Sequence, residues 1–213
     1  MKIFKKKYVF ESNIYKFKDT DKITSSVTEF YKKDPFPNYN NIETRESIMT
    51  KGNSNFFSKT MKEFIGYKKL ILEAGSGTSQ LSIYLALGTN NHIFALDPTL
   101  ESIQLGSDFA KKNYINNISF VKADIFSDVF KEDLFDFIYC SGVLHHTKKP
   151  YHGFDILVKN LKKNGYIVIG LYNKYGRLRT YIRQIIYKYF SKKLAKSLDP
   201  ILRKIDRKSL DKI

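Results

Sequence analysis

The stretch KLILEAGSGTSQ, residues 69–80, joins a short apolar run to a turn that contains two glycines, Gly75 and Gly77. An apolar run of this length that ends at a glycine turn indicates a strand buried in a sheet. Two glycines one residue apart allow the backbone to approach a bound ligand closely. We therefore expect a nucleotide-like ligand at the carboxyl end of this strand.

Four further apolar runs of strand length follow the turn: HIFALD (92–97), ISFVKAD (118–124), FDFIYCS (135–141) and GYIVIGLY (165–172). Each is nearly continuous in apolar residues, as strands buried on both faces of a parallel sheet are. Segments with helical spacing lie between them: QLSIYLALG (80–88), TLESIQLGSDFAKKNY (99–114) and YHGFDILVKNLKKNG (151–165). Gly88 and Gly165 are expected to end two of these helices. The alternation predicts an α/β fold with a doubly wound, mostly parallel sheet.

The residues around the glycine turn discriminate among nucleotide-like ligands. A phosphate loop needs a Lys-Ser or Lys-Thr pair at a fixed distance after the turn, and this chain has none there. A dinucleotide fingerprint needs a third glycine where Gln80 stands. Pyrophosphate binding is therefore disfavoured, and a dehydrogenase is a distant alternative.

Three of the expected strands end in acidic residues, Glu73, Asp97 and Asp124, at the sheet edge where ligands bind. A carboxylate at Glu73 can hold the cationic amino group of a methionine moiety. One at Asp97 can accept hydrogen bonds from both hydroxyls of a ribose. Asp124 can accept from an adenine amino group, and the N–H of Ile125 can meet a ring nitrogen. This set favours S-adenosylmethionine over a dinucleotide.

With these residues the chain resembles class I S-adenosylmethionine-dependent methyltransferases over roughly residues 65–172. LEAGSGTSQ resembles the first motif of that family, ALDPT the second, VKADIF the third and FDFIYCSGVLHHT the fourth. The resemblance implies a Rossmann-like methyltransferase fold of strand order 3-2-1-4-5-7-6. It also implies S-adenosyl-L-methionine as cofactor, held by Glu73, Gly75, Gly77, Asp97, Pro98, Asp124, Ile125 and Ser141. Ser79 replaces the common third glycine of the family, which is expected to alter the loop geometry slightly.

FYKKDPFPNYN, SGVLHHT and GLYNKYGRLRT are similar to a bacterial group of type-11/12-like methyltransferases with an N-terminal YxxxPFPxY element. The two prolines make DPFPNY (34–39) conformationally stiff. In one interpretation Tyr31, Phe36 and Tyr39 form a lid over cofactor or substrate. In the other, this segment is a turn that packs its aromatic rings onto the domain.

Methyl transfer is a displacement at a sulfonium, and much of its catalysis is proximity and in-line orientation. His146 and His145 follow the fourth strand and are the candidate catalytic residues, since either could deprotonate or orient an acceptor hydroxyl. Packing within the loop is the alternative for each. Cys140 lies inside an apolar strand and is expected to be a buried structural thiol. No cluster of Cys and His has metal-ligand spacing, so no metal site is predicted.

The formal net charge is +16, from 37 basic and 21 acidic residues, which suggests an anionic partner such as RNA or a membrane surface. A biased coding composition would give the same total. Residues 174–213 carry 13 Lys/Arg against three acids. Apolar residues recur there at helical spacing: Leu178, Ile182, Ile185, Ile186, Tyr189, Phe190 and Leu194. The predicted basic amphipathic helix could cover the sheet, lie on anionic lipid or contact RNA phosphates.

We expect an N-terminal extension or lid (1–65), an α/β core that binds S-adenosylmethionine (66–173) and a basic helical segment (174–213). Strands six and seven are not recognisable after residue 172, so we expect either a shortened version of the domain that lacks its last two strands or a split product. No apolar run is long enough to span a bilayer, and a cytoplasmic location is expected. A small-molecule or lipid-like methyl acceptor is expected first. RNA methylation and a truncated, non-catalytic binding protein are the alternatives, and the oligomeric state stays open.

Overall fold

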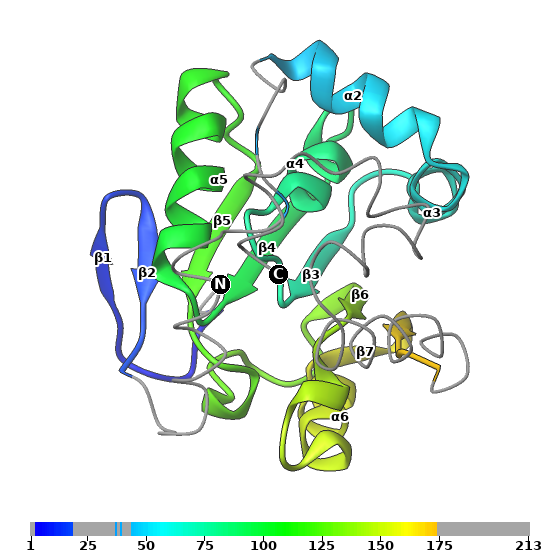
Figure 1. The fold of residues 1–213 in the computed structure, drawn as a ribbon. Helices are drawn as coiled ribbons and strands as arrows, with labels where there is room; N and C mark the ends of the chain where they lie inside the picture. Colours follow the sequence, from blue (N-terminus) through cyan, green and yellow to red (C-terminus); the bar gives the residue numbers. More distant parts are fainter. Residues whose placement is uncertain (1–2, 19–36, 38, 40–43, 174–213) are drawn as a thin grey trace, which may run out of the picture. The chain divides into compact units, whose positions relative to one another are not determined.

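The computed structural model describes residues 3–18, 37, 39 and 44–173. Its sheet has seven strands in the order β1-β2-β5-β4-β3-β6-β7 (Figure 1). The strands are β1 (Val9–Glu11), β2 (Ile14–Lys16), β3 (Leu70–Ala74), β4 (His92–Asp97), β5 (Ile118–Lys122), β6 (Phe135–Ser141) and β7 (Leu161–Gly170). β1 pairs antiparallel with β2, and every other pairing in this sheet is parallel. The predicted doubly wound, mostly parallel sheet is confirmed, with the five predicted strands in the order 3-2-1-4-5.

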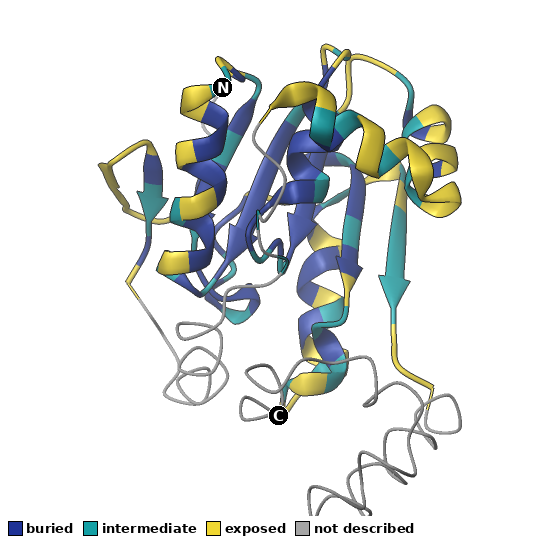
Figure 2. Ribbon diagram, turned by 45° about the horizontal axis from the view of Figure 1, so that its top comes forward, coloured by how far each residue is buried: buried dark blue, intermediate teal, exposed yellow. Residues whose placement is uncertain are grey.

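Five helices and two 3-10 turns accompany the described sheet: α2 (Arg45–Ser54), α3 (Phe56–Ile65), α4 (Gln80–Ala86), α5 (Leu100–Lys112), α6 (Pro150–Asn160), η1 (Ile125–Ser127) and η2 (Leu144–His146). Buried side chains alternate along each central strand between two hydrophobic clusters, as Ile93 and Phe94 do in β4. Helices α2 to α5 contribute to one cluster and α6 to the other. Figure 2 shows the central strands buried between these helices. Because β3, β4, β5 and β6 run parallel, their carboxyl ends lie at one edge of the sheet.

The N-terminal hairpin of β1 and β2 was not predicted. Ser12 and Asn13 have φ angles of 53° and 63°, the positive values that a two-residue hairpin turn favours. β2 then runs parallel to β5, with the fully buried Ile14 opposite Phe120. In the sequence, two three-residue segments with β-forming residues flank the pair Ser12-Asn13, and this pattern could have predicted the hairpin. The hairpin places residues 9–16 in the sheet itself, whereas the domain boundary predicted at residue 65 stays a prediction.

Helix α2 was not predicted, and one local prediction differs from the structure. Thr44 is the N-cap residue of α2 and forms a capping box with Ser47. Gly165 does not end a helix: α6 ends at Asn160, and Leu161 already pairs with Phe135. Gly88, with φ of 68°, follows α4 as predicted. The expected shortening of the sheet and the basic helix fall on residues 174–213, outside the described residues.

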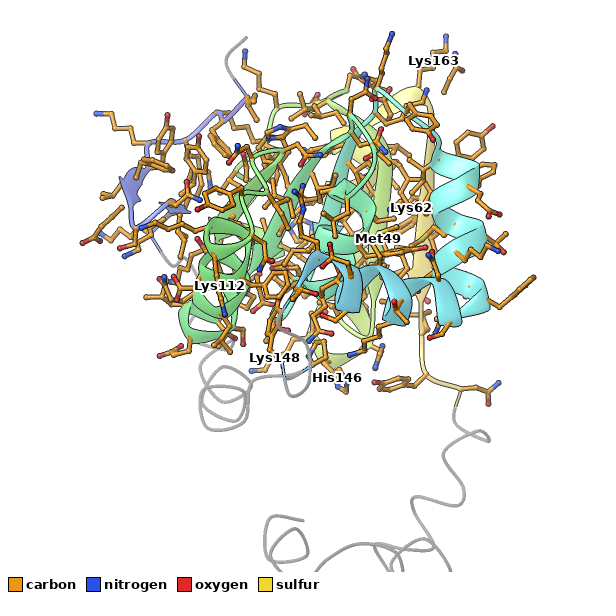
Figure 3. The ribbon with its side chains drawn as sticks, turned by 90° about the horizontal axis from the view of Figure 1, so that it is seen from above. Met49, Lys62, Lys112, His146, Lys148 and Lys163 are labelled. Carbon is orange, nitrogen blue, oxygen red and sulfur yellow. The ribbon has the colours of Figure 1, made fainter. Side chains whose placement is uncertain are left out.

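Lys62 connects α3 to the carboxyl end of α4. Its Nζ donates hydrogen bonds of 2.6 Å to the carbonyl oxygens of Tyr84 and Leu87 and lies 4.3 Å from the centre of the Tyr84 ring. Figure 3 shows Lys62 beside Met49, whose Sδ is 3.5 Å from the same nitrogen. Burial lowers the pKa of Lys62 to about 8. A cation at this end of a helix meets the negative pole of its dipole and satisfies its last carbonyls.

Replacing Lys62 with Met is expected to lower the free energy of unfolding by about 2 kcal/mol, because two partly buried carbonyls lose a charged donor. Urea unfolding followed by circular dichroism measures the change. Lys59→Met is the matched control, since Lys59 lies on the exposed side of the same helix. Equal stability of the two variants would show that Lys62 does not hold α4.

No helix among the described residues is long and apolar enough to cross a membrane.

Candidate functional site

The glycine turn after β3 is tied to the end of β4. The N–H groups of Gly75 and Ser76 both donate to the carbonyl oxygen of Leu96, at 2.7 and 2.9 Å. Gly75 has a φ of 79°, and a Cβ added to it would lie 2.1 Å from Cγ2 of Val143 in the loop after β6. A side chain at position 75 is therefore excluded both by the backbone conformation and by space. The loop after β6 packs directly on the turn.

Asp97 uses one carboxylate oxygen to hold the glycine turn and the other to hold the start of α5. Oδ2 accepts a hydrogen bond of 2.9 Å from the N–H of Gly77, and Oδ1 accepts one of 2.8 Å from the N–H of Thr99. Burial raises the pKa of Asp97, and the two backbone bonds oppose that rise. Each oxygen keeps a second acceptor site, so ribose hydroxyls can still bond to it. Asp97 thus has a positioning role that the sequence analysis missed, and Pro98 follows it half-buried.

Glu73 is a buried acid at the end of β3, with 6% of its surface exposed. Its Oε2 accepts a hydrogen bond from Oγ of Ser82 in α4. Burial raises the pKa of Glu73 to about 7, and the charge of Asp97 adds to this rise. A carboxyl group that is costly to ionise in the empty site would be stabilised as a carboxylate by a bound cation.

Asp124 and Ile125 stand at the end of β5, where Asp124 begins the turn η1. Its Oδ1 accepts a hydrogen bond of 2.8 Å from the N–H of Phe126. The N–H of Ala123 donates to the carbonyl oxygen of Asp97 at 3.2 Å, which joins the ends of β4 and β5. The structure therefore gathers Glu73, Asp97 and Asp124 on three adjacent strand ends.

The loop after β6 carries the predicted histidines. Ser141 ends β6 and is exposed, and the N–H of Gly142 donates to the carbonyl oxygen of Gly170 at 3.0 Å. The rings of His145 and His146 lie 4.1 Å apart between centroids, with His145 half-buried and His146 exposed. Catalytic roles for the two histidines stay predictions.

Cys140 is buried beneath this loop, and burial raises the pKa of its thiol to about 12. The thiol is therefore protonated at neutral pH. The predicted burial of Cys140 is confirmed, and its purely structural role stays a prediction.

Ser79 adopts the left-handed conformation, with φ of 63°, at the position where the family commonly has glycine. It is fully buried at the start of α4. Gly106 in α5 provides the space for it: a Cβ on Gly106 would lie 2.7 Å from the carbonyl oxygen of Thr78 and 2.9 Å from Cβ of Ser79. A single glycine inside a helical pattern was the available signal for this close contact.

Tyr39 and Pro37 contact the same turn from the N-terminal segment. The hydroxyl of Tyr39 donates to the carbonyl oxygen of Thr78 at 2.8 Å, and its ring stacks on Phe109 with centroids 5.0 Å apart. Oγ1 of Thr78 donates to the carbonyl oxygen of Pro37. Pro37 and Tyr39 thus pack onto the turn, and the choice between the two interpretations of the whole segment stays a prediction. Tyr31 and Phe36 lie outside the described residues.

The raised pKa of Glu73 predicts that the empty protein loses stability as the pH rises from 4.5 to about 7. In that range the unfolded chain has released the proton, which the folded protein keeps, so the free energy of unfolding falls with increasing pH. Full loss amounts to about 3 kcal/mol. Urea unfolding at intervals across this range measures it, and the Glu73→Gln variant is expected to lack this contribution. An identical pH dependence in both proteins would contradict the raised pKa.

The chain matches the methyltransferase domain family over residues 67–204. An uncharacterized protein of Synechococcus sp. is 31% identical over 117 residues, which cover 54% of this chain and 28% of that protein. The chain therefore matches little more than a quarter of the length of this curated relative. Among solved structures, YcgJ of Bacillus subtilis superposes with a TM-score of 0.52 at 20% identity, covering 60% of this chain and 56% of that one.

A SAM-dependent methyltransferase of Aquifex aeolicus superposes with a TM-score of 0.50 at 20% identity, covering 67% of this chain and 71% of that one. At these identities the two structural likenesses show the fold. The family match extends from the strand before the glycine turn to beyond β7 and covers more than half of the chain. The chain therefore belongs to the methyltransferase domain family and has the fold of S-adenosylmethionine-dependent methyltransferases.

Proposed function

We propose that this protein binds S-adenosyl-L-methionine at the carboxyl ends of β3, β4 and β5 and transfers its methyl group to an acceptor. The observation that carries this proposal is the group of three buried acids, Glu73, Asp97 and Asp124, around a turn whose two glycines are partly exposed. A ligand with a sulfonium and an ammonium group suits such an acidic site, whereas a pyrophosphate would be repelled by it. Family membership supports the same cofactor.

Different residues of this chain would bind different parts of the cofactor. Glu73 would hold the ammonium group, Asp97 the ribose, and Asp124 with the N–H of Ile125 the adenine. Gly75 and Gly77 would allow close approach of the backbone, with Pro98 and Ser141 lining the site. The bound cofactor supplies the activated methyl group, and the chain orients it toward the acceptor and excludes water.

The acceptor in this proposal is a small molecule or a lipid-like compound that approaches the loop after β6. Exposed Ser141 and His146 mark the accessible side of that loop. RNA is the second candidate, and the net charge of +16 is the observation that favours it.

Incubation with methyl-labelled S-adenosylmethionine tests both candidates. Three acceptor pools are compared: a small-metabolite extract, vesicles that contain anionic lipid, and total RNA. We expect label in the small-metabolite or lipid pool and equimolar S-adenosylhomocysteine, with neither formed by Asp97→Asn. Label in RNA would support the second candidate. Cofactor binding without transfer to any pool would favour a non-catalytic binding protein.

His146→Gln is expected to lower kcat by at least about 100-fold with the acceptor found in that assay, because glutamine cannot take up a proton. Binding of S-adenosylhomocysteine is expected to change less than twofold, since the side chain is assigned to the acceptor side. His145→Gln is tested in parallel, and His152→Gln in α6 is the matched control. An unchanged kcat for His146→Gln would remove His146 from the catalytic assignment.

A further inference from the structure

We propose that Tyr39 is a positioning residue that holds the glycine turn in its binding conformation and thereby offsets the strain introduced by Ser79. This inference rests on the proposed function, because its main readout is the affinity for the cofactor. It assigns to the N-terminal segment a role in cofactor binding that does not require contact with the cofactor.

Ser79 is a strained point of the turn. Residues with a Cβ avoid the left-handed region, where that atom crowds the following carbonyl. Ser79 occupies this region with φ of 63° and ψ of 23°, and its side chain makes no capping bond to α4. Within the turn its N–H donates to the carbonyl oxygen of Ser76 at 2.8 Å, and its Oγ lies 3.2 Å from that of Ser76. A strained residue of this kind persists only where its surroundings fix it.

The residues on both sides of Ser79 are fixed by the N-terminal segment. Thr78 accepts a hydrogen bond from the Tyr39 hydroxyl at 2.8 Å and donates one to the carbonyl oxygen of Pro37. Nε2 of Gln80 lies 3.4 Å from the same Pro37 oxygen. Gly77, whose N–H donates to Asp97, immediately precedes Thr78. The hydrogen bonds to Thr78 therefore also restrain Gly77, the glycine expected to allow close approach of the ligand.

Tyr39 is itself held in place. Its ring stacks on Phe109 in α5, the helix whose Gly106 makes room for Ser79. Burial raises the pKa of the Tyr39 hydroxyl well above its usual range, with a further contribution from the charge of Glu73. The hydroxyl therefore keeps its proton at neutral pH and can donate it to the carbonyl oxygen of Thr78.

The test is a double-mutant cycle of Tyr39→Phe and Ser79→Gly, with S-adenosylhomocysteine binding measured by isothermal titration. Tyr39→Phe keeps the stacked ring and removes one hydrogen bond, so we expect about fivefold weaker binding. Glycine relieves the strain, so the double variant is expected to bind within about twofold of wild type. Tyr114→Phe, an exposed residue at the end of α5, is the control. At saturating cofactor, kcat of Tyr39→Phe is expected to stay unchanged.

Wild-type affinity in Tyr39→Phe would overturn the positioning role. If Tyr39→Phe loses the same affinity when combined with Ser79→Gly, Tyr39 does not offset the strain at Ser79. If the wild-type protein does not bind S-adenosylhomocysteine, the proposed function fails. The melting temperatures of the wild type, Tyr39→Phe, Ser79→Gly and the double variant then still test whether Tyr39 offsets the strain at Ser79. Tyr39→Phe should then lower Tm by roughly 3 °C in the presence of Ser79 and by clearly less in the presence of Ser79→Gly.

Discussion

Gly75→Ala is expected to weaken S-adenosylhomocysteine binding by more than about 100-fold. The added Cβ would lie 2.1 Å from Cγ2 of Val143, and the backbone at this position has a φ of 79°. Either the turn or the loop after β6 must move, and both belong to the proposed site. Isothermal titration measures the affinity, and circular dichroism shows whether the variant folds.

Gly88→Ala is the control that shows how much of the Gly75→Ala effect comes from backbone strain alone, without the steric clash. Gly88 has a similar φ of 68° but nothing within 4 Å of an added Cβ. This control is expected to lose about 1 kcal/mol of stability and to bind the cofactor normally. Gly75→Ala combined with Val143→Ala removes the clashing methyl group and should recover part of the lost affinity. Near-normal binding by Gly75→Ala would show that the glycine turn does not contact the cofactor.

Asp97→Asn is the second substitution expected to weaken cofactor binding strongly. An amide has one acceptor oxygen, whereas the carboxylate of Asp97 serves the N–H groups of both Gly77 and Thr99. One of these buried donors must lose its acceptor, which costs about 1–3 kcal/mol. If Gly77 is that donor, the glycine turn loses one of its links to β4 and keeps the two bonds to the Leu96 carbonyl; a ribose would also lose one of its acceptors. We expect a loss of affinity of about 100-fold and a lower melting temperature.

Asp108→Asn is the matched control for Asp97→Asn. Asp108 is exposed on α5 and accepts a hydrogen bond of 2.9 Å from Gln104, away from the glycine turn. Neither affinity nor stability should change measurably in this variant. Equal affinities in the two variants would contradict both roles of Asp97.

The central strands were predictable because both of their faces are buried. HIFALD (92–97) is apolar almost throughout, and β4 has the same bounds as the prediction. The N-terminal hairpin was not predicted, because its second strand is stabilised by pairing with β5, more than 100 residues away. Local propensity cannot show such a partner. The prediction that Gly165 ends a helix was wrong for a related reason: glycine occurs in bulged strands as well as at helix ends.

At the site, strand order indicated which acids come together but not how their oxygens are used. Glu73, Asp97 and Asp124 could be placed at one sheet edge, because parallel strands end on the same side. That Asp97 bonds to two backbone N–H groups depends on the conformation of the turn. The pairing of Ser79 with Gly106, and the contact of Tyr39 with Thr78, likewise join segments that no local pattern connects.

The most direct test of the central claim is isothermal titration of the purified wild-type protein with S-adenosylhomocysteine, with Asp97→Asn beside it. The predicted result is one-to-one binding in the micromolar range that the variant loses. A wild-type protein that is folded by circular dichroism but releases no heat with either S-adenosylhomocysteine or S-adenosylmethionine would contradict the claim that this acidic strand edge is a cofactor site.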